Sequence, residues 1–104
     1  MVETPAHSPL EGRRRRLLFR ASHRGTREND FLVGGFVAPR LAGFSESEID
    51  VLEAIMELPD PILTDWLTGR RPMPSEHDSA EDDLARLVPM LRAMYEARGR
   101  GPLG

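Results

Sequence analysis

The chain has 104 residues, a formal net charge of −3 and no cysteine. Its length favours a single domain, and the lack of cysteine excludes disulfides and thiolate metal sites and suits a reducing compartment. No apolar run approaches the ~20 residues of a transmembrane helix, so we expect no membrane insertion. The N-terminal arginines are not followed by the apolar region of a secretory signal. We therefore expect a cytoplasmic protein, or a mitochondrial matrix protein if the source is eukaryotic.

Charge is distributed unevenly along the chain. Residues 1–40 carry a net charge of +4, residues 41–68 carry −7, and residues 69–104 are neutral. All 14 basic residues are arginine, and arginine favours bidentate contacts with carboxylates. The sequence therefore predicts a basic N-terminal segment, residues 1–40, followed by an acidic central segment, residues 41–68.

Residues 10–98 are predicted to form one all-α domain, a small bundle of five helices, because no segment alternates with the period of a strand for long enough. Residues 1–9 and 99–104 are expected to be disordered tails. Gly34 and Gly35 lie inside the second predicted helix, where each costs about 1 kcal/mol. Such a pair is tolerated best where another helix packs very close.

The first two helices are predicted over residues 10–22 and 26–37. Gly25 breaks the chain between them, and Pro39 is expected to end the second helix, because the residue before a proline avoids the helical region. Their apolar faces are expected to consist of Leu17, Leu18 and Ala21 in the first helix and of Leu32, Gly35 and Phe36 in the second.

The third helix is predicted over residues 45–58. A capping box opens it, with Ser45 as the N-cap residue and Glu48 as the N3 residue, and Pro59 stops it. The residues expected to face the core are Ile49, Leu52, Ile55 and Met56.

The fourth helix is predicted over residues 61–68. Asp60 is its expected cap and Pro61 its first helical residue, and Gly69 ends it. Its apolar residues are Ile62, Leu63, Trp66 and Leu67, and the single tryptophan is expected to anchor the core.

The fifth helix is predicted to begin at a cap formed by Ser79. It carries the clearest amphipathic stripe of the chain. Pro89 lies inside that stripe and should kink the helix or split it near Arg86. The stripe consists of Leu84, Leu87, Val88, Leu91, Met94 and Tyr95.

One polar stretch, around Gly25, is not explained by helix formation alone. Gly25 lies between Arg24 and Arg27, and Glu28 and Asp30 follow at once. An exposed Arg24–Glu28 pair would add only a few tenths of a kcal/mol, and a bundle would be as stable with alanine in place of the glycine. The residues alone leave two interpretations open, a helix start with solvated side chains and a docking surface.

The sequence gives little support for catalytic or metal chemistry. His7, His23 and His77 are spread along the chain, and none forms an i, i+4 pair with another ligand. A zinc site is therefore not expected, and nothing supports a Ser–His nucleophile. We expect no metal and no active site.

The arginine run from Arg13 to Arg16 can in principle bind phosphates. However, four adjacent arginines on a helix point around most of its circumference, and the domain is acidic with few aromatic residues for stacking. We therefore expect no nucleic acid. A solvated helix start is favoured, and a salt-sensitive contact with an acidic protein surface stays open. The acidic third helix is expected to be a solvated face.

Two segments carry a family pattern. Residues 24–28 form an Arg-Gly-x-x-Glu motif after a basic and apolar helix, and residues 60–67 form an Asp-x-x-Leu-x-x-Trp-Leu element. In these segments the chain resembles the FAD assembly factor family of succinate dehydrogenase, called SdhE in bacteria. The resemblance covers roughly residues 13–70, and Arg27 departs from it, because the family more often has an apolar residue there. The matching positions are Arg24, Gly25, Glu28, Asp60, Leu63, Trp66 and Leu67.

The resemblance implies a five-helix assembly factor without its own active site. Such proteins bind the flavoprotein subunit of succinate dehydrogenase, and in some bacteria that of fumarate reductase. They promote the autocatalytic covalent attachment of FAD to a histidine of that subunit. We accordingly expect a monomer that holds no cofactor tightly, with FAD attached to the partner. The help given is proximity and orientation.

The resemblance also implies residue roles. Gly25 would let the partner backbone approach closely, Arg24 would bind a partner carboxylate or carbonyl, and Glu28 would accept from partner donors or hold Arg24 in place. The arginine run would steer the encounter. The wider partner footprint is expected to include Arg20, Arg27, Asp30 and Phe31, and the structural residues are expected to be Leu63, Trp66 and Leu67.

Two other classes of protein stay open. An antitoxin-like or regulatory interaction module, unrelated to flavin, would bind a toxin or a membrane protein. A nucleic-acid-binding helical domain would bind with an affinity that falls steeply with salt.

Overall fold

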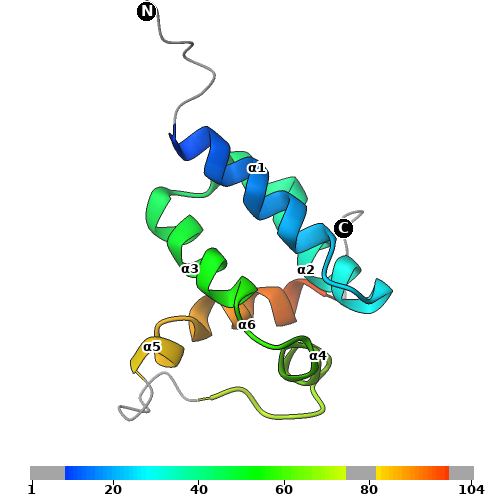
Figure 1. The fold of residues 1–104 in the computed structure, drawn as a ribbon. Helices are drawn as coiled ribbons and strands as arrows, with labels where there is room; N and C mark the ends of the chain where they lie inside the picture. The colour runs from blue at the N-terminus through cyan, green and yellow to red at the C-terminus, as the bar shows by residue number, and fades with distance from the viewer. Residues whose placement is uncertain (1–8, 75–81, 99–104) are drawn as a thin grey trace, which may run out of the picture.

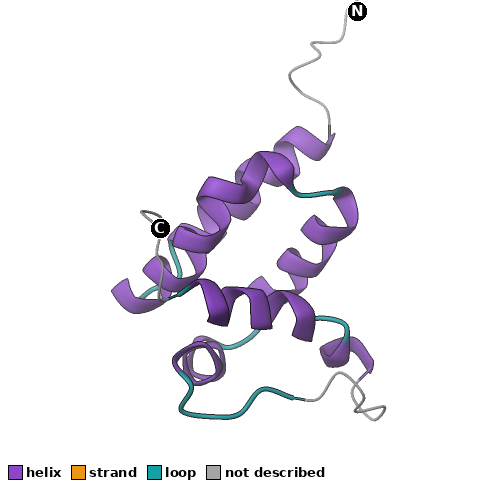
Figure 2. Ribbon diagram, turned by 180° about the vertical axis from the view of Figure 1, so that it is seen from behind, coloured by secondary structure: helices purple, strands orange, loops and turns teal. Residues whose placement is uncertain are grey.

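The computed structural model describes residues 9–74 and 82–98. This part of the chain contains helices and connecting segments but no strand (Figures 1 and 2), so the predicted all-α fold is confirmed. The elements in chain order are α1 (Pro9–Ser22), α2 (Arg27–Arg40), the 3₁₀ turn η2 (Leu41–Gly43), α3 (Glu46–Met56), α4 (Asp60–Thr68), α5 (Asp82–Ala85) and α6 (Val88–Ala97).

The predicted tails lie outside the described residues, except that Pro9 already belongs to α1. The predicted cap Ser79 lies outside them as well. Pro89 splits the fifth predicted helix into α5 and α6 and lies in the first turn of α6, where the missing N–H of a proline costs nothing. The expected interruption near Arg86 is therefore confirmed.

Helix α2 is the centre of the fold. It pairs with α1 across a short loop to form a helical hairpin, and it also contacts α4 and α6, while α3 contacts α1 and α6 (Figure 1). The core is mainly aliphatic and includes Trp66, and its most buried large side chains are Leu17, Ile49, Leu52, Ile55, Leu63, Leu67, Leu91 and Met94.

Gly34 sets the close approach of α1 and α2. A Cβ atom at this position would lie 2.9 Å from the hydroxyl oxygen of Ser22 and 3.0 Å from its Cα, and 3.1 Å from the carbonyl oxygen of Ala21. The expectation of a close helix contact therefore holds for Gly34. It does not hold for Gly35, whose Cβ would meet nothing within 4 Å.

The apolar face predicted for α2 is confirmed for Phe36 and was wrong for Leu32 and Gly35. Leu32 and Gly35 are only half-buried, whereas Val33 and Val37 are fully buried together with Phe36. Helix α2 is apolar around most of its circumference, so periodicity alone gives no clear face. The contact of Gly34 with α1 decides which side turns inward.

Pro39 was also predicted wrongly as the end of the second helix, because α2 continues through it to Arg40. Proline in the last turn removes one hydrogen bond, to the carbonyl of Gly35. The chain then tightens at once into η2. Helix α2 thus ends at Arg40, three residues after the predicted end at residue 37.

The helix caps follow the local sequence closely. The side chain of Ser45 accepts from the backbone N–H of Glu48, whose carboxylate accepts from the backbone N–H of Ser45, so the predicted capping box is present. Gly69 ends α4 with φ of 83°, a conformation that favours glycine. The start of α4 differs by one residue, because Pro59 is the N-cap residue and Asp60 is already helical.

The acidic face of α3 was expected to be solvated, but several of its carboxylates form ion pairs with α1. Arg13 of α1 forms ion pairs with Glu46, Asp50 and Glu53, and Arg20 pairs with Glu57. The hydrogen bonds that Arg13 donates to the carboxylate of Glu53, and then to that of Asp50, hold the pKa of Arg13 above its ordinary value. The charge asymmetry of the sequence is therefore used partly inside the fold, between α1 and α3.

Candidate functional site

The loop between α1 and α2 presents its backbone to solvent. Gly25 is exposed and has φ of 114°, a conformation that side chains make unfavourable. The next residue, Thr26, is the N-cap of α2, and its hydroxyl accepts from the backbone N–H of Asn29 at 3.1 Å. The loop therefore requires a glycine for its shape, independently of any partner.

Arg24 is turned into the protein. Only 9% of its side chain is exposed. Its Nη1 donates to the carbonyl of Met56 at 2.9 Å and its Nη2 to that of Leu58 at 3.2 Å. Its Nε and Nη2 lie 3.0 and 2.9 Å from Oδ1 of Asp60. The guanidinium group thus satisfies carbonyls left free at the end of α3 and pairs with the first turn of α4.

Asn29 ties the same loop to α4. It is the only buried polar residue among those described. Its Nδ2 donates to the carbonyl of Asp60 at 3.4 Å, and its Oδ1 accepts from the hydroxyl of Thr64 at 2.7 Å. A carboxylate oxygen of Asp30 accepts from the backbone N–H of Arg24. Arg24 and Asn29 therefore connect the loop and the start of α2 to α4, and Asp30 ties the loop to α2.

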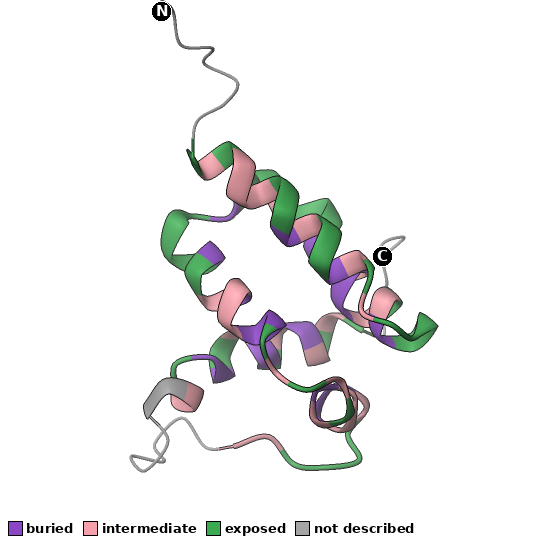
Figure 3. Ribbon diagram, in the orientation of Figure 1, coloured by how far each residue is buried: buried purple, intermediate pink, exposed green. Residues whose placement is uncertain are grey.

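The opposite side of the loop faces outward. Gly25, Arg27 and Glu28 are exposed, so the outer end of the α1–α2 hairpin carries exposed residues (Figure 3). The side chains of Arg27 and Glu28 form no hydrogen bond and no ion pair with the described part of the chain. The positively charged Arg27 and the negatively charged Glu28, whose side chains have no partner in the described chain, thus lie close to Gly25.

Two aromatic side chains flank this loop. Phe19 is 63% exposed and Phe31 is 53% exposed, and they are the only large hydrophobic residues classed as exposed in the described ranges. They lie six residues before and six residues after Gly25. The ring of Phe19 stacks on that of His23 at 4.1 Å between centroids. Exposed apolar area is thus concentrated at the loop end of the hairpin, which is typical of interaction sites.

The seven residues predicted to bind a partner fall into two groups. Those that face outward are Gly25, Arg27, Glu28, Phe31 and Arg20, although Arg20 also pairs with Glu57. Arg24 and Asp30 instead build the loop from inside. Glu28 forms no bond with Arg24, because Arg24 lies before the helix and points to α4. The three predicted structural residues, Leu63, Trp66 and Leu67, are all buried.

The arginine run also divides. Arg13 binds α3, and Arg14 donates to the carbonyls of Leu41 and Phe44, the latter at 2.9 Å. Arg15 and Arg16 are exposed and form no bond with the described residues. Only the second half of the run is therefore available to attract an acidic partner.

Sequence reasoning missed two members of the network, Asn29 and Thr64. The spacing of Asn29 from Val33 and Val37 is i, i+4, i+8, which places it on the buried face of α2. That signal was hidden by the choice of the wrong face for this helix. Thr64 shows no comparable signal, because its role depends on the packing of α4 against α2.

The described residues form no candidate metal centre. They contain no group of three histidine or acidic side chains that could hold a metal ion. No described helix is long and apolar enough to cross a membrane. What the site does offer is a rigid, exposed loop bordered by charges and aromatic rings.

These features define a small helical protein with a preformed surface for a macromolecular partner. Residues 15–95 match the Sdh5 family model, described as "Flavinator of succinate dehydrogenase", and the chain belongs to this family. The resemblance seen in the two motifs is therefore confirmed.

Similar proteins carry related names. The chain is 48% identical over 91 residues to the FAD assembly factor SdhE of Acetobacter pasteurianus, an alignment that covers 88% of this chain and 75% of that protein. It is 29% identical over 72 residues to the mitochondrial succinate dehydrogenase assembly factor 2 of Dictyostelium discoideum, covering 69% and 51%. For the protein of that name in Drosophila virilis the values are 36% over 82 residues, covering 77% and 50%.

The chain therefore spans about half the length of these two mitochondrial relatives. No solved structure matches it.

Proposed function

We propose that this chain is an assembly factor that binds the flavoprotein subunit of succinate dehydrogenase and promotes covalent attachment of FAD to it. Membership of the flavinator family supports this function, as does the name of the Acetobacter relative. The single structural observation that carries the proposal is the exposure of Gly25 in the α1–α2 loop and of Glu28 in the first turn of α2, beside a loop that Arg24 holds from behind.

The mechanism follows from the division between inner and outer residues. Arg24 and Asn29 fix the loop against α4, so little conformational freedom is lost when a partner binds. Arg27 and Glu28 then meet charged groups of the partner, and Phe31 adds apolar area. Binding holds the partner with its histidine and flavin in line, which can contribute several kcal/mol through proximity and orientation.

In this function the chain supplies no acid, base or nucleophile, and it holds no cofactor of its own. FAD stays with the flavoprotein subunit throughout. The fumarate reductase flavoprotein is a second partner of the same chemistry. The proposed factor is a monomer of the cytoplasm or the mitochondrial matrix.

The test is co-expression of the flavoprotein subunit with this chain. The flavin fluorescence of the denatured flavoprotein band should be strong with the wild type and weak with Gly25→Arg or Glu28→Ala. A matched control is Glu96→Gln, which changes an exposed acidic residue of α6 that forms no bond with the described residues. Fluorescence that stays at the wild-type level with both loop variants would overturn the proposal.

A further inference from the structure

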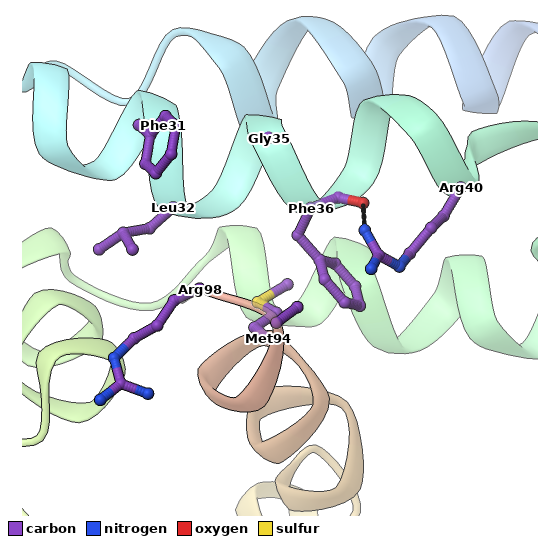
Figure 4. A pocket seen from close by; sticks show the side chains of 8 residues that line it. Phe31, Leu32, Gly35, Phe36, Arg40, Met94 and Arg98 are labelled. Carbon is purple, nitrogen blue, oxygen red and sulfur yellow. Dashed lines mark hydrogen bonds between the residues drawn. The ribbon is translucent and has the colours of Figure 1, made fainter. Parts of the chain in front are cut away.

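A second surface continues from the loop along α2. A groove lies between α2 and the end of α6, and we call it the Gly35 groove after its centre (Figure 4). Phe31 and Arg40 line it from α2, and Arg98 lines it just after α6. The function proposed above does not require this groove.

Nothing within the described chain requires a glycine at position 35. The built Cβ meets no atom within 4 Å, and φ is not positive. The neighbouring Gly34 differs, because its Cβ would collide with α1. Glycine is a poor helix former, so its presence in the middle of α2 leaves open space in the groove at a cost to the helix.

The groove is continuous with the outward face of the loop. Glu28, Phe31 and Gly35 follow one another at i, i+3 and i+7 along α2, a spacing that places them on one helical face. Phe31 is 53% exposed and lies one turn before the glycine. A partner segment that contacts Glu28 can therefore run along α2 over the ring of Phe31 and into the open space at Gly35.

Two arginines border the groove. The guanidinium group of Arg40 lies over the ring of Phe36, which lines the groove, at 4.3 Å, and that of Arg98 lies over the ring of Tyr95, at the edge beyond the lining residues, at 3.7 Å. Arg40 donates to the carbonyl of Phe36 and Arg98 to that of Tyr95. Neither pairs with a carboxylate of the described residues, and no acidic residue lines the groove. The arginines are thus preset on aromatic rings and free to bind an anion.

We propose that the Gly35 groove binds a segment of the flavoprotein subunit in which an apolar side chain lies beside carboxylates. The apolar side chain packs on Phe31 over Gly35, and the carboxylates pair with Arg40 and Arg98. The charge complementarity and the continuity with the loop select this occupant. The inference rests on the proposed function, because it names the part of the same partner that lies on α2.

The first experiment measures the dissociation constant of the purified flavoprotein subunit, without covalent FAD, for variants of the full chain. Gly35→Leu places a side chain in the groove and should weaken binding at least about tenfold, a change of about 1.4 kcal/mol. Gly35→Ala should weaken binding less, yet raise the melting temperature, because it improves the helix. Opposite effects on stability and binding distinguish an occupied groove from a damaged fold.

The matched control is Gly43→Leu. This glycine also has open space at its Cβ, but it belongs to η2 and does not line the groove. Its substitution should leave the dissociation constant unchanged. The double variant Arg40→Gln and Arg98→Gln should weaken binding and make the affinity less dependent on salt.

The outcomes separate the two proposals. Wild-type affinity for Gly35→Leu, with binding lost in Gly25→Arg, would overturn the groove and leave the proposed function standing. Weak binding by Gly35→Leu with an unchanged salt dependence in the double arginine variant would overturn the acidic nature of the segment. If the wild type does not bind the flavoprotein subunit, both proposals fail.

Discussion

Arg24 and Asp60 join the two sequence motifs of the chain in one ion pair. Nε and Nη2 of the arginine lie 3.0 and 2.9 Å from the same carboxylate oxygen, across 36 positions of sequence. The glycine of the first motif is thereby placed against the beginning of α4, with 3.8 Å between a built Cβ of Gly25 and Oδ2 of Asp60. The first motif is a rigid structure because the second motif holds it.

Removal of the Arg24 side chain should destabilise the fold and the loop together. Arg24→Ala leaves the carbonyls of Met56 and Leu58 without a donor and Asp60 without its cation. We expect a loss of about 2–4 kcal/mol in the free energy of unfolding, measured by urea denaturation. Arg24→Lys should restore little of it, because a single ammonium group cannot reach all three acceptors.

A double-mutant cycle with Asp60→Asn checks the pair directly. The two losses should be less than additive, since both variants break the same contact. Full additivity, or a stable Arg24→Ala variant, would show that the guanidinium group does not hold the loop.

Glu28 should behave in the opposite way. It is exposed and bonds to no described residue, and its only internal role is a favourable position in the first turn of α2. Glu28→Gln should therefore change the free energy of unfolding by less than about 1 kcal/mol, while the flavin fluorescence of the co-expressed flavoprotein falls severalfold. Circular dichroism melts of the same preparation provide the stability measurement. A large loss of stability would show that Glu28 stabilises the fold and would contradict its assignment to the docking surface.

Gly34 and Gly35 should respond to the same substitution with opposite signs. Gly34→Ala forces α1 away from α2, because the nearest atoms include the backbone of Ser22 and Ala21, and we expect a loss of about 1–3 kcal/mol. Gly35→Ala should instead add up to about 1 kcal/mol, or roughly 4–8 °C in melting temperature for a domain of this size. Thermal melts of the two variants, measured together with the wild type, give the sign of each shift in melting temperature. Equal shifts would mean that the α1–α2 contact is not set by Gly34.

Asn29 should be essential to the stability of the loop. Its side chain is fully buried and bonds to Thr64 and to the carbonyl of Asp60. Asn29→Ala removes the side-chain bonds to both partners and should cost about 2–3 kcal/mol. Replacing both partners of the side-chain bond, with Thr64→Val added, should cost less than the sum of the single changes.

The comparison between Asn29 and Thr68 provides the control for that measurement. Among the described residues, the hydroxyl of Thr68 bonds only to the carbonyl of Thr64 in its own helix, at 2.7 Å. Thr68→Val should therefore cost clearly less than Asn29→Ala. A reversal of this order in urea denaturation would contradict the role assigned to the network.

Local chemistry made several elements predictable. The capping box at Ser45, the left-handed Gly69 and the break caused by Pro89 each depend on residues within one or two helical turns, and each was confirmed. The inner face of α2 was not predictable in this way. Five apolar residues larger than alanine lie on different sides of this helix, Phe31, Leu32, Val33, Phe36 and Val37. A contact of Gly34 with another helix selects among them.

The residues of the candidate site likewise fall into those predictable from local sequence and those whose orientation depends on tertiary packing. Local sequence is enough to predict that a glycine between two arginines connects two helices, because glycine and cap residues act on the backbone next to them. Whether Arg24 points inward and Glu28 outward depends on tertiary packing. That choice depends on Asp60, Met56 and Leu58, which the packing of α3 and α4 brings within hydrogen-bonding distance of the loop. A buried guanidinium group needs several acceptors at once, and only the folded chain supplies them.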